Sequence, residues 1–118
     1  MNLTELENKM KKFGEMYYII IPDKGHLVWR YGTGDNVEIF DIEAYKKRQG
    51  VGKELFRMLI GELGENPPHA IFAFVGDDNT DVQKFYKVLG FDISHELDHL
   101  YRYGARLVSA SYKKVKKL

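Results

Sequence analysis

The chain has 118 residues, of which 44% are hydrophobic, 30% charged and 14% aromatic, a composition that predicts one globular domain and excludes a disordered chain. It contains no cysteine, which excludes disulfides, cysteine-ligated metals and a cysteine nucleophile and suits a cytoplasmic location. The net charge is +1, but the last residues are lysine-rich, so the body of the chain is acidic and we expect no nucleic-acid partner. The longest apolar run, Met16–Ile21, is too short to span a membrane.

The N-terminal third predicts a helix followed by a β-hairpin. Apolar residues recur at helical spacing after Thr4, which predicts a helix over Glu5–Phe13. Two β-prone runs, Met16–Ile21 and Leu27–Tyr31, flank the turn Pro22–Gly25 and predict two antiparallel strands.

A third strand is predicted over Val37–Ala44, where apolar residues alternate. Because Glu38 and Asp41 differ by an odd number, strict alternation places them on opposite faces. It also places Ile42 on the face of Glu38, and Ile39 on the face of Asp41.

The hydrophobic period then changes to that of a helix. A wide apolar stripe predicts a helix over Gly50–Leu63, and the short apolar run Ala70–Val75 predicts a buried strand. Asn79 or Thr80 begins another helix, with Gln83 in capping-box position.

The C-terminal third fits either a helix or a strand, and alternating small residues favour a strand over Arg106–Lys114. The order strand, helix, strand implies that Val37–Ala44 and Ala70–Val75 pair in parallel. We therefore expect a single α+β domain over residues 1–118. Its three layers contain a mixed, mostly antiparallel sheet with a central parallel strand pair flanked by helices.

A basic loop with two glycines joins the third strand to the next helix. It reads Lys47-Arg48-Gln49-Gly50-Val51-Gly52-Lys53. Unpaired N–H groups and the positive end of the helix dipole make such a helix start a candidate pyrophosphate site. The alternative is a turn whose glycines only start the helix, with solvated lysines around it.

A second motif follows one helix and one strand later. It reads Asn79-x-x-Val82-x-x-Phe85-Tyr86-x-x-x-Gly90-Phe91. With this motif the chain resembles the GCN5-related N-acetyltransferases, the GNAT family. That family's acetyl-CoA loop reads (Q/R)-x-x-G-x-(G/A), and here it reads Lys47-x-x-Gly50-x-Gly52, with lysine in the first position. The resemblance covers Val37–Phe91 and implies a GNAT-like acyl-CoA N-acyltransferase fold with a shortened N-terminal part.

The resemblance implies roles for particular residues. Backbone groups of Asp41, Ile42 and Glu43 would pair with the pantetheine arm of acetyl-CoA. The N–H groups of Arg48–Lys53 would hold its pyrophosphate. Asn79 would contact the pantetheine region, and Tyr86 would lie next to the sulfur.

The same residues permit amide formation. A phenol has an ordinary pKa of about 10, so Tyr86 can donate a proton to the departing thiolate at neutral pH. The alternative is a core tyrosine whose hydroxyl is bonded to the backbone. An N–H group near Ile42 can stabilise the oxyanion. Without cysteine we expect direct attack by the acceptor on acetyl-CoA.

The resemblance therefore implies an enzyme that uses acetyl-CoA as cosubstrate to acetylate a primary amine of a small molecule or peptide, without a metal. Glu38 is the first candidate for the general base, and an exposed structural carboxylate or a water chain are the alternatives. Several acids near the strands favour a cationic acceptor; they are Glu38, Asp41, Glu43, Asp77 and Asp78. A catalytically idle domain of the same fold, which binds CoA or mediates assembly, is the rival hypothesis.

Two further features of the sequence bear on function. His95–His99 reads H-E-x-x-H, the zinc-protease signature, but it follows a strand-like segment and lacks a third ligand, so we expect no zinc hydrolase. Exposed aromatic residues near the last strand, Tyr101, Tyr103 and Tyr112, are candidates for a homodimer interface.

Overall fold

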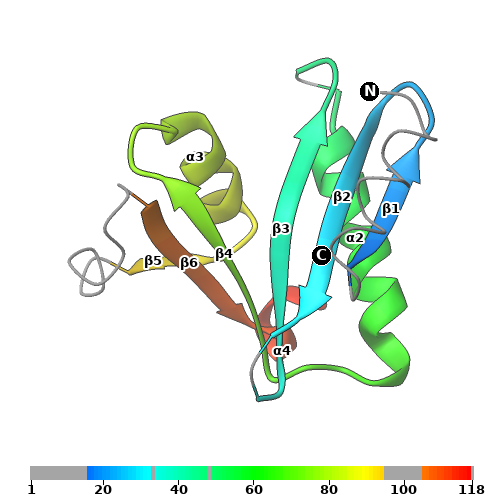
Figure 1. Ribbon diagram of the computed structural model, residues 1–118, viewed down its shortest axis with the longest axis vertical. Coiled ribbons are helices and arrows are strands. Elements are labelled where there is room, and N and C mark those ends of the chain that lie inside the picture. Colours follow the sequence, from blue (N-terminus) through cyan, green and yellow to red (C-terminus); the bar gives the residue numbers. More distant parts are fainter. Residues whose placement is uncertain (1–15, 33, 48, 95–104, 118) are drawn as a thin grey trace.

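The computed structural model describes residues 16–32, 34–47, 49–94 and 105–117, which form one mixed sheet with helices packed on it. The strand order is β1-β2-β3-β4-β6-β5 (Figure 1). The strands are β1 (Tyr17–Ile21), β2 (Gly25–Tyr31), β3 (Asn36–Ala44), β4 (Ala70–Gly76), β5 (Asp92–Ser94) and β6 (Ala105–Ser111). Neighbouring strands are antiparallel except β3 and β4, which are parallel, as the sequence predicts.

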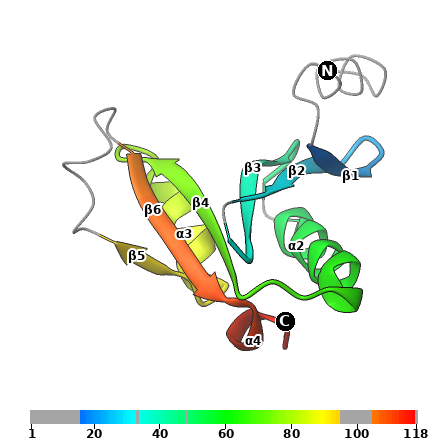
Figure 2. The same cartoon turned by 60° about the horizontal axis from the view of Figure 1, so that its bottom comes forward.

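The helices that connect and end these strands are α2 (Val51–Glu62), the 3-10 turn η1 (Leu63–Glu65), α3 (Thr80–Val88) and α4 (Tyr112–Val115). In Figure 2, α2 lies along β1–β3, whereas α3 lies against the β4 half of the sheet. The apolar stripe of α2 is buried, and it consists of Val51, Leu55, Phe56, Leu59 and Ile60. One core cluster joins this stripe to Tyr86 of α3 and to the facing strands, so both helices contribute to the same hydrophobic core. None of the described helices is long and apolar enough to cross a membrane.

The parallel strands β3 and β4 pair over only three residues each. The paired rungs run from Asn36 with Ala70 to Glu38 with Phe72, and the strands diverge beyond them (Figure 1). From Ile39 onward, β3 therefore hydrogen-bonds to β2 on one side and turns its other edge toward the separation. From Asp41 to Glu43 no strand among the described residues pairs with this edge, and the backbone N–H and C=O groups of a strand edge can receive an added strand-like ligand.

A β-bulge in β3 overturns the predicted alternation of that strand. Asp41 lies opposite Val28 of β2, but Ile39 lies opposite Trp29, so Phe40 is an extra residue in the ladder. The extra residue reverses the face of everything after it. Ile42 therefore packs on the core, while Asp41 shares the outer face with Glu38, contrary to the sequence prediction.

The last strand is confirmed, but it ends earlier than predicted. Ser111 stops β6, because its side-chain oxygen accepts the N–H of Lys114 and caps α4. Tyr112 is half-buried and donates its hydroxyl to the carbonyl of Ile60 at 3.2 Å, so the prediction that its side chain is exposed is wrong, while the predicted homodimer interface stays a prediction. The predicted N-terminal helix, the H-E-x-x-H segment and the remaining two interface tyrosines lie outside the described residues.

Candidate functional site

The N-terminus of α2 follows the end of β3 and is open at its first residue. Gly50 is the N-cap, with a left-handed φ of 72°, and no side chain of the described residues caps the helix. Nothing lies within 4 Å of the position that a Cβ on Gly50 would occupy. The first N–H groups of an α-helix have no partner inside it and carry the positive end of the dipole. This helix start can therefore hold an anionic group; Arg48 lies outside the described residues.

Gly52 has a packing role in addition to the binding role that its motif predicts. A Cβ at this position would lie 2.9 Å from the ring of Phe85, so the missing side chain lets α3 approach the first turn of α2. An exposed ion pair between Lys47 and Asp81, 3.7 Å long, spans the same two helix starts. The element after β3 and the element after β4 thus meet where the two strands diverge.

Tyr86 is held in place by the end of α3. Gly90 has a φ of 98°, and its N–H bonds to the carbonyl of Lys87 while the N–H of Phe91 bonds to the carbonyl of Tyr86. These two bonds form a Schellman motif, whose apolar contact is the packing of the Phe91 ring on the Tyr86 ring at 5.0 Å. Gly90, which the sequence predicts to end this helix, therefore also fixes the ring of Tyr86, the candidate acid.

The phenol of Tyr86 is chemically suited to remain protonated. The residue is only 2% exposed, and burial, with a smaller contribution from the charge of Asp41, raises the pKa of Tyr86 well above its ordinary value. A neutral phenol at physiological pH is a proton donor, which is the role expected of the candidate acid.

Because the pKa of Tyr86 is raised, we expect the folded protein to lose stability at alkaline pH. A phenol that stays neutral in the folded chain but ionises in the unfolded chain contributes stability below about pH 10, and this stability is lost as the pH rises further. We expect the melting temperature to fall from pH 9 to 11 more steeply in the wild type than in Tyr86→Phe, measured by circular dichroism. Tyr31→Phe, which removes an exposed hydroxyl, should keep the wild-type slope. Equal slopes for all three proteins would mean that the Tyr86 phenol ionises as readily in the folded chain as in the unfolded one.

The side chain of Asn79 is engaged at the start of α3. Its Oδ1 accepts the N–H of Val82 at 3.3 Å, so Asn79 is the N-cap residue. Gln83 does not complete a capping box, because its Nε2 donates instead to the carbonyls of Gly76 and Asp77. These bonds fix the turn after β4, beside the site where the pantetheine contact is expected.

Glu38, the sequence candidate for the base, is buried rather than exposed. It is 8% exposed, and Arg30 binds one of its oxygens through both Nε and a terminal nitrogen, each at 2.8 Å. The alternative of an exposed structural carboxylate is therefore wrong. The guanidinium of Arg30 therefore occupies Oε1 of Glu38.

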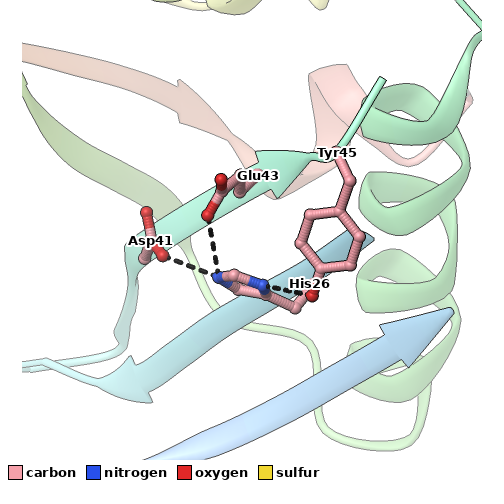
Figure 3. Close-up of polar contacts among 4 residues, drawn as sticks. All are labelled: His26, Asp41, Glu43 and Tyr45. Carbon is pink, nitrogen blue, oxygen red and sulfur yellow. Dashed lines mark hydrogen bonds and ion pairs between the residues drawn. The ribbon is translucent and has the colours of Figure 1, made fainter. Parts of the chain in front are cut away.

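A polar cluster that the sequence did not reveal lies on the outer face of β2 and β3 (Figure 3). His26 is 5% exposed, and its Nε2 lies 2.8 Å from Oδ2 of Asp41 and 3.7 Å from Oε2 of Glu43. Its Nδ1 lies 2.9 Å from the hydroxyl of Tyr45. Burial and the charges of Glu43, Asp41 and Asp23 raise the pKa of Tyr45, so this hydroxyl also stays protonated at neutral pH. The three metal-type ligand atoms of His26, Asp41 and Glu43 lie within 4.8 Å of one another, close enough for one divalent cation to contact them.

Comparisons with known proteins identify the fold and the family of the chain. No curated protein sequence matches the chain significantly. Among solved structures, an acetyltransferase from Bacillus subtilis in complex with CoA has a TM-score of 0.66 and 17% identity, over 92% of this chain and 84% of that chain. A GNAT family acetyltransferase from Elizabethkingia anophelis with acetyl-CoA bound has a TM-score of 0.66 and 18% identity, over 91% of this chain and 82% of that chain. The ribosomal-protein-S18-alanine N-acetyltransferase from Escherichia coli has a TM-score of 0.68 and 17% identity, over 95% of this chain and 79% of that chain.

At these identities, the structural likeness establishes the fold. The family follows from the sequence itself: the model of the Acetyltransferase (GNAT) family matches residues 7–91. Since this match spans more than half of the chain and includes both glycine-containing motifs, the chain belongs to the GNAT family of acetyltransferases.

Proposed function

We propose that the protein is an N-acetyltransferase that binds acetyl-CoA and moves its acetyl group directly to a primary amine. The observation that carries this proposal is the meeting of three features where β3 and β4 diverge. They are the edge of β3 from Asp41 to Glu43, with which no described strand pairs on the β4 side, the start of α2, which no described side chain caps, and the fixed, protonated phenol of Tyr86. Two of the similar structures contain CoA or acetyl-CoA, which supports the same cosubstrate here.

Each feature would take one part of the cosubstrate. The edge of β3 from Asp41 to Glu43 offers backbone groups to the amides of the pantetheine arm, as an added strand would pair. The N–H groups at Gly50–Lys53 offer the positive end of a helix to the pyrophosphate. Asn79 would close the α3 side of the site, and Tyr86 would give its proton to the departing sulfur.

Three steps make up the chemistry at the thioester. A neutral amine attacks the carbonyl carbon, and the N–H group near Ile42 stabilises the charge that develops on the carbonyl oxygen. Collapse of the intermediate breaks the C–S bond, and Tyr86 donates its proton to the sulfur. The sequence contains no cysteine, so no acetyl group can pass through an enzyme thiol.

The absence of cysteine also gives a clean assay. The full chain is titrated with acetyl-CoA by calorimetry and then incubated with acetyl-CoA and a panel of primary amines, while a thiol reagent follows release of CoA. Because the chain contributes no thiol, every thiol detected comes from CoA. We expect micromolar binding and amine-dependent CoA release, with the acetylated amine seen by mass spectrometry. Binding without release on any amine would favour the idle domain, and no binding would refute the proposed function.

A further inference from the structure

The polar cluster around His26 lies beside the proposed reaction centre. Asp41 follows the bulge residue Phe40, on the part of β3 that no longer pairs with β4. Its carboxylate is close enough to raise the pKa of the Tyr86 phenol through charge repulsion. Phe85, the neighbour of Tyr86, packs on Gly52 in the first turn of α2, so α3 brings the proposed acid to the same separation of the two strands.

The two groups reach that separation from opposite faces of the sheet. Tyr86 belongs to the core on the face covered by α2, in one cluster with Val51 and Leu55. Asp41 contacts His26, which alternates with the core residue Leu27 and so points to the outer face. A thioester between β3 and β4 would have the proton donor for its sulfur on one face and a carboxylate on the other.

On this basis we propose that Asp41 binds the ammonium group of the acceptor and accepts its proton, and that His26 positions the carboxylate. This inference rests on the proposed acetyl transfer and names its acceptor class, a cationic primary amine. The Asp41 side chain is 51% exposed, so an amine can reach it. Glu38 is far less accessible, because its side chain is 10% exposed and bound to Arg30.

The hydrogen bonds of His26 are consistent with a positioning role. The carboxylate oxygen of Asp41 can only accept, so the contact at 2.8 Å requires a hydrogen on Nε2 of His26, while the Tyr45 hydroxyl bonds to Nδ1 at 2.9 Å and fixes the plane of the ring. One oxygen of the carboxylate is thereby held, while the exposed part of the group faces solvent. Glu43, 59% exposed and 3.7 Å from the same Nε2, adds a second negative charge that favours a cation.

The proposed step balances in atoms and charge. The ammonium gives one proton to Asp41, and the freed lone pair forms the C–N bond while the carbonyl π electrons move to oxygen. The intermediate returns those electrons, the C–S bond breaks, and the sulfur takes the proton of Tyr86. The second proton of the acylated nitrogen restores Tyr86, and Asp41 passes its proton to water. The products are the amide, the CoA thiol and one released proton.

The test is Asp41→Asn in the full chain, assayed at pH 7 to 10 with 1,5-diaminopentane and with aniline, which is neutral at pH 7. At pH 7 we expect kcat/KM for the diamine to fall about 100-fold, the size usual for loss of a general base. The loss should shrink toward pH 10, where the amine has lost its own proton, and it should be small for aniline. Acetyl-CoA affinity should stay within about twofold of the wild type. Asp92→Asn on β5, an exposed residue 4.0 Å from Lys114, is the matched control and should not change the rate.

Other titratable and charged groups in this region also affect how the rate depends on pH. These are His26 and Arg30 from β2, Glu38, Glu43 and Tyr45 from β3 and its end, Asp23 from the hairpin turn, and Tyr86 from α3. Glu38→Gln is therefore assayed in parallel. A pH-dependent loss in Glu38→Gln but not in Asp41→Asn would overturn the proposal.

His26 is tested by a pair of variants. His26→Leu removes both ring nitrogens and should lower kcat about tenfold without changing acetyl-CoA binding, whereas His26→Gln retains a donor to Asp41 and should recover part of the rate. Equal rates for the two variants would contradict the positioning role.

Two further outcomes would overturn the proposal while leaving acetyl transfer intact. One is a wild type that acetylates aniline but not the diamine. The other is activity lost with EDTA and restored by Zn²⁺, which would make His26 and Asp41 metal ligands instead. A wild type that acetylates no amine refutes the proposed function itself.

Discussion

Tyr86→Phe should lower the turnover number about 100-fold at pH 7, with acetyl-CoA affinity within about twofold of the wild type. The physical reason is that a thiolate is a poor leaving group until it is protonated, and the buried phenol keeps its proton at neutral pH. The variant removes one oxygen and keeps the ring, so the contact with Phe91 that ends α3 should persist. The loss is therefore expected in kcat, measured by thiol release at saturating amine and acetyl-CoA.

The matched control for that experiment is Tyr31→Phe, the same change at a tyrosine that is 49% exposed on β2. It should leave kcat and the acetyl-CoA affinity as in the wild type. If Tyr86→Phe kept more than half of the wild-type turnover, the phenol would be a core residue only, and the sulfur would have to obtain its proton from water.

The hydrophobic periods of the sequence predicted most of this fold because they report burial directly. The stripe of α2 and the short apolar run of β4 are core segments, and their order along the chain implied the parallel pair. The stop at Gly90 was also predictable, since a glycine followed by an apolar residue is typical of a Schellman motif. The position of Tyr86 follows from that stop.

The outer face of β3 was not predictable in the same way. A single extra residue, Phe40, reverses the alternation, and nothing in the local pattern distinguishes a bulge from a regular strand. Asp41 and Glu38 therefore lie on the same face of the sheet, although strict alternation would place them on opposite faces. The pairing of His26 with Glu43 depends on the register of β2 against β3, which is set by the connection between Tyr31 and Asn36 and by the bulge, and neither could be read from the local pattern.

The two glycines of the basic loop have different structural roles, which the sequence alone could not distinguish. Gly50 has a left-handed backbone and open space around it, as a ligand-binding loop requires. Gly52 is a packing glycine, because Phe85 occupies the space of its side chain. Distinguishing them requires knowledge of what α3 contacts, and that contact joins residues far apart in the chain.

A third glycine gives the largest expected effect on stability. A Cβ on Gly25, at the start of β2, would lie 2.5 Å from the carbonyl oxygen of Glu43 and 2.9 Å from Cγ1 of Val51. The carbonyl belongs to the paired strand β3 and cannot move without breaking the ladder that also holds Asp41 and His26. We expect Gly25→Ala to destabilise the protein by about 3 kcal/mol, the upper range for overpacking. For a chain of this length the melting temperature should fall by roughly 10 °C.

Gly61→Ala is the same substitution in a place where it should act in the opposite direction. Gly61 lies exposed near the end of α2, and nothing is within 4 Å of its added Cβ. Alanine restricts the unfolded chain and favours the helix, so the expected gain is about 0.5 to 1 kcal/mol, or roughly 2 to 4 °C. The melting temperatures of both variants are measured by circular dichroism. Because both changes are glycine to alanine, the difference between them separates a steric clash with the backbone from an effect of helix propensity. If Gly25→Ala melted within about 2 °C of the wild type, the close packing of β2 against β3 and α2 would be wrong, and with it the register that brings His26 to Asp41.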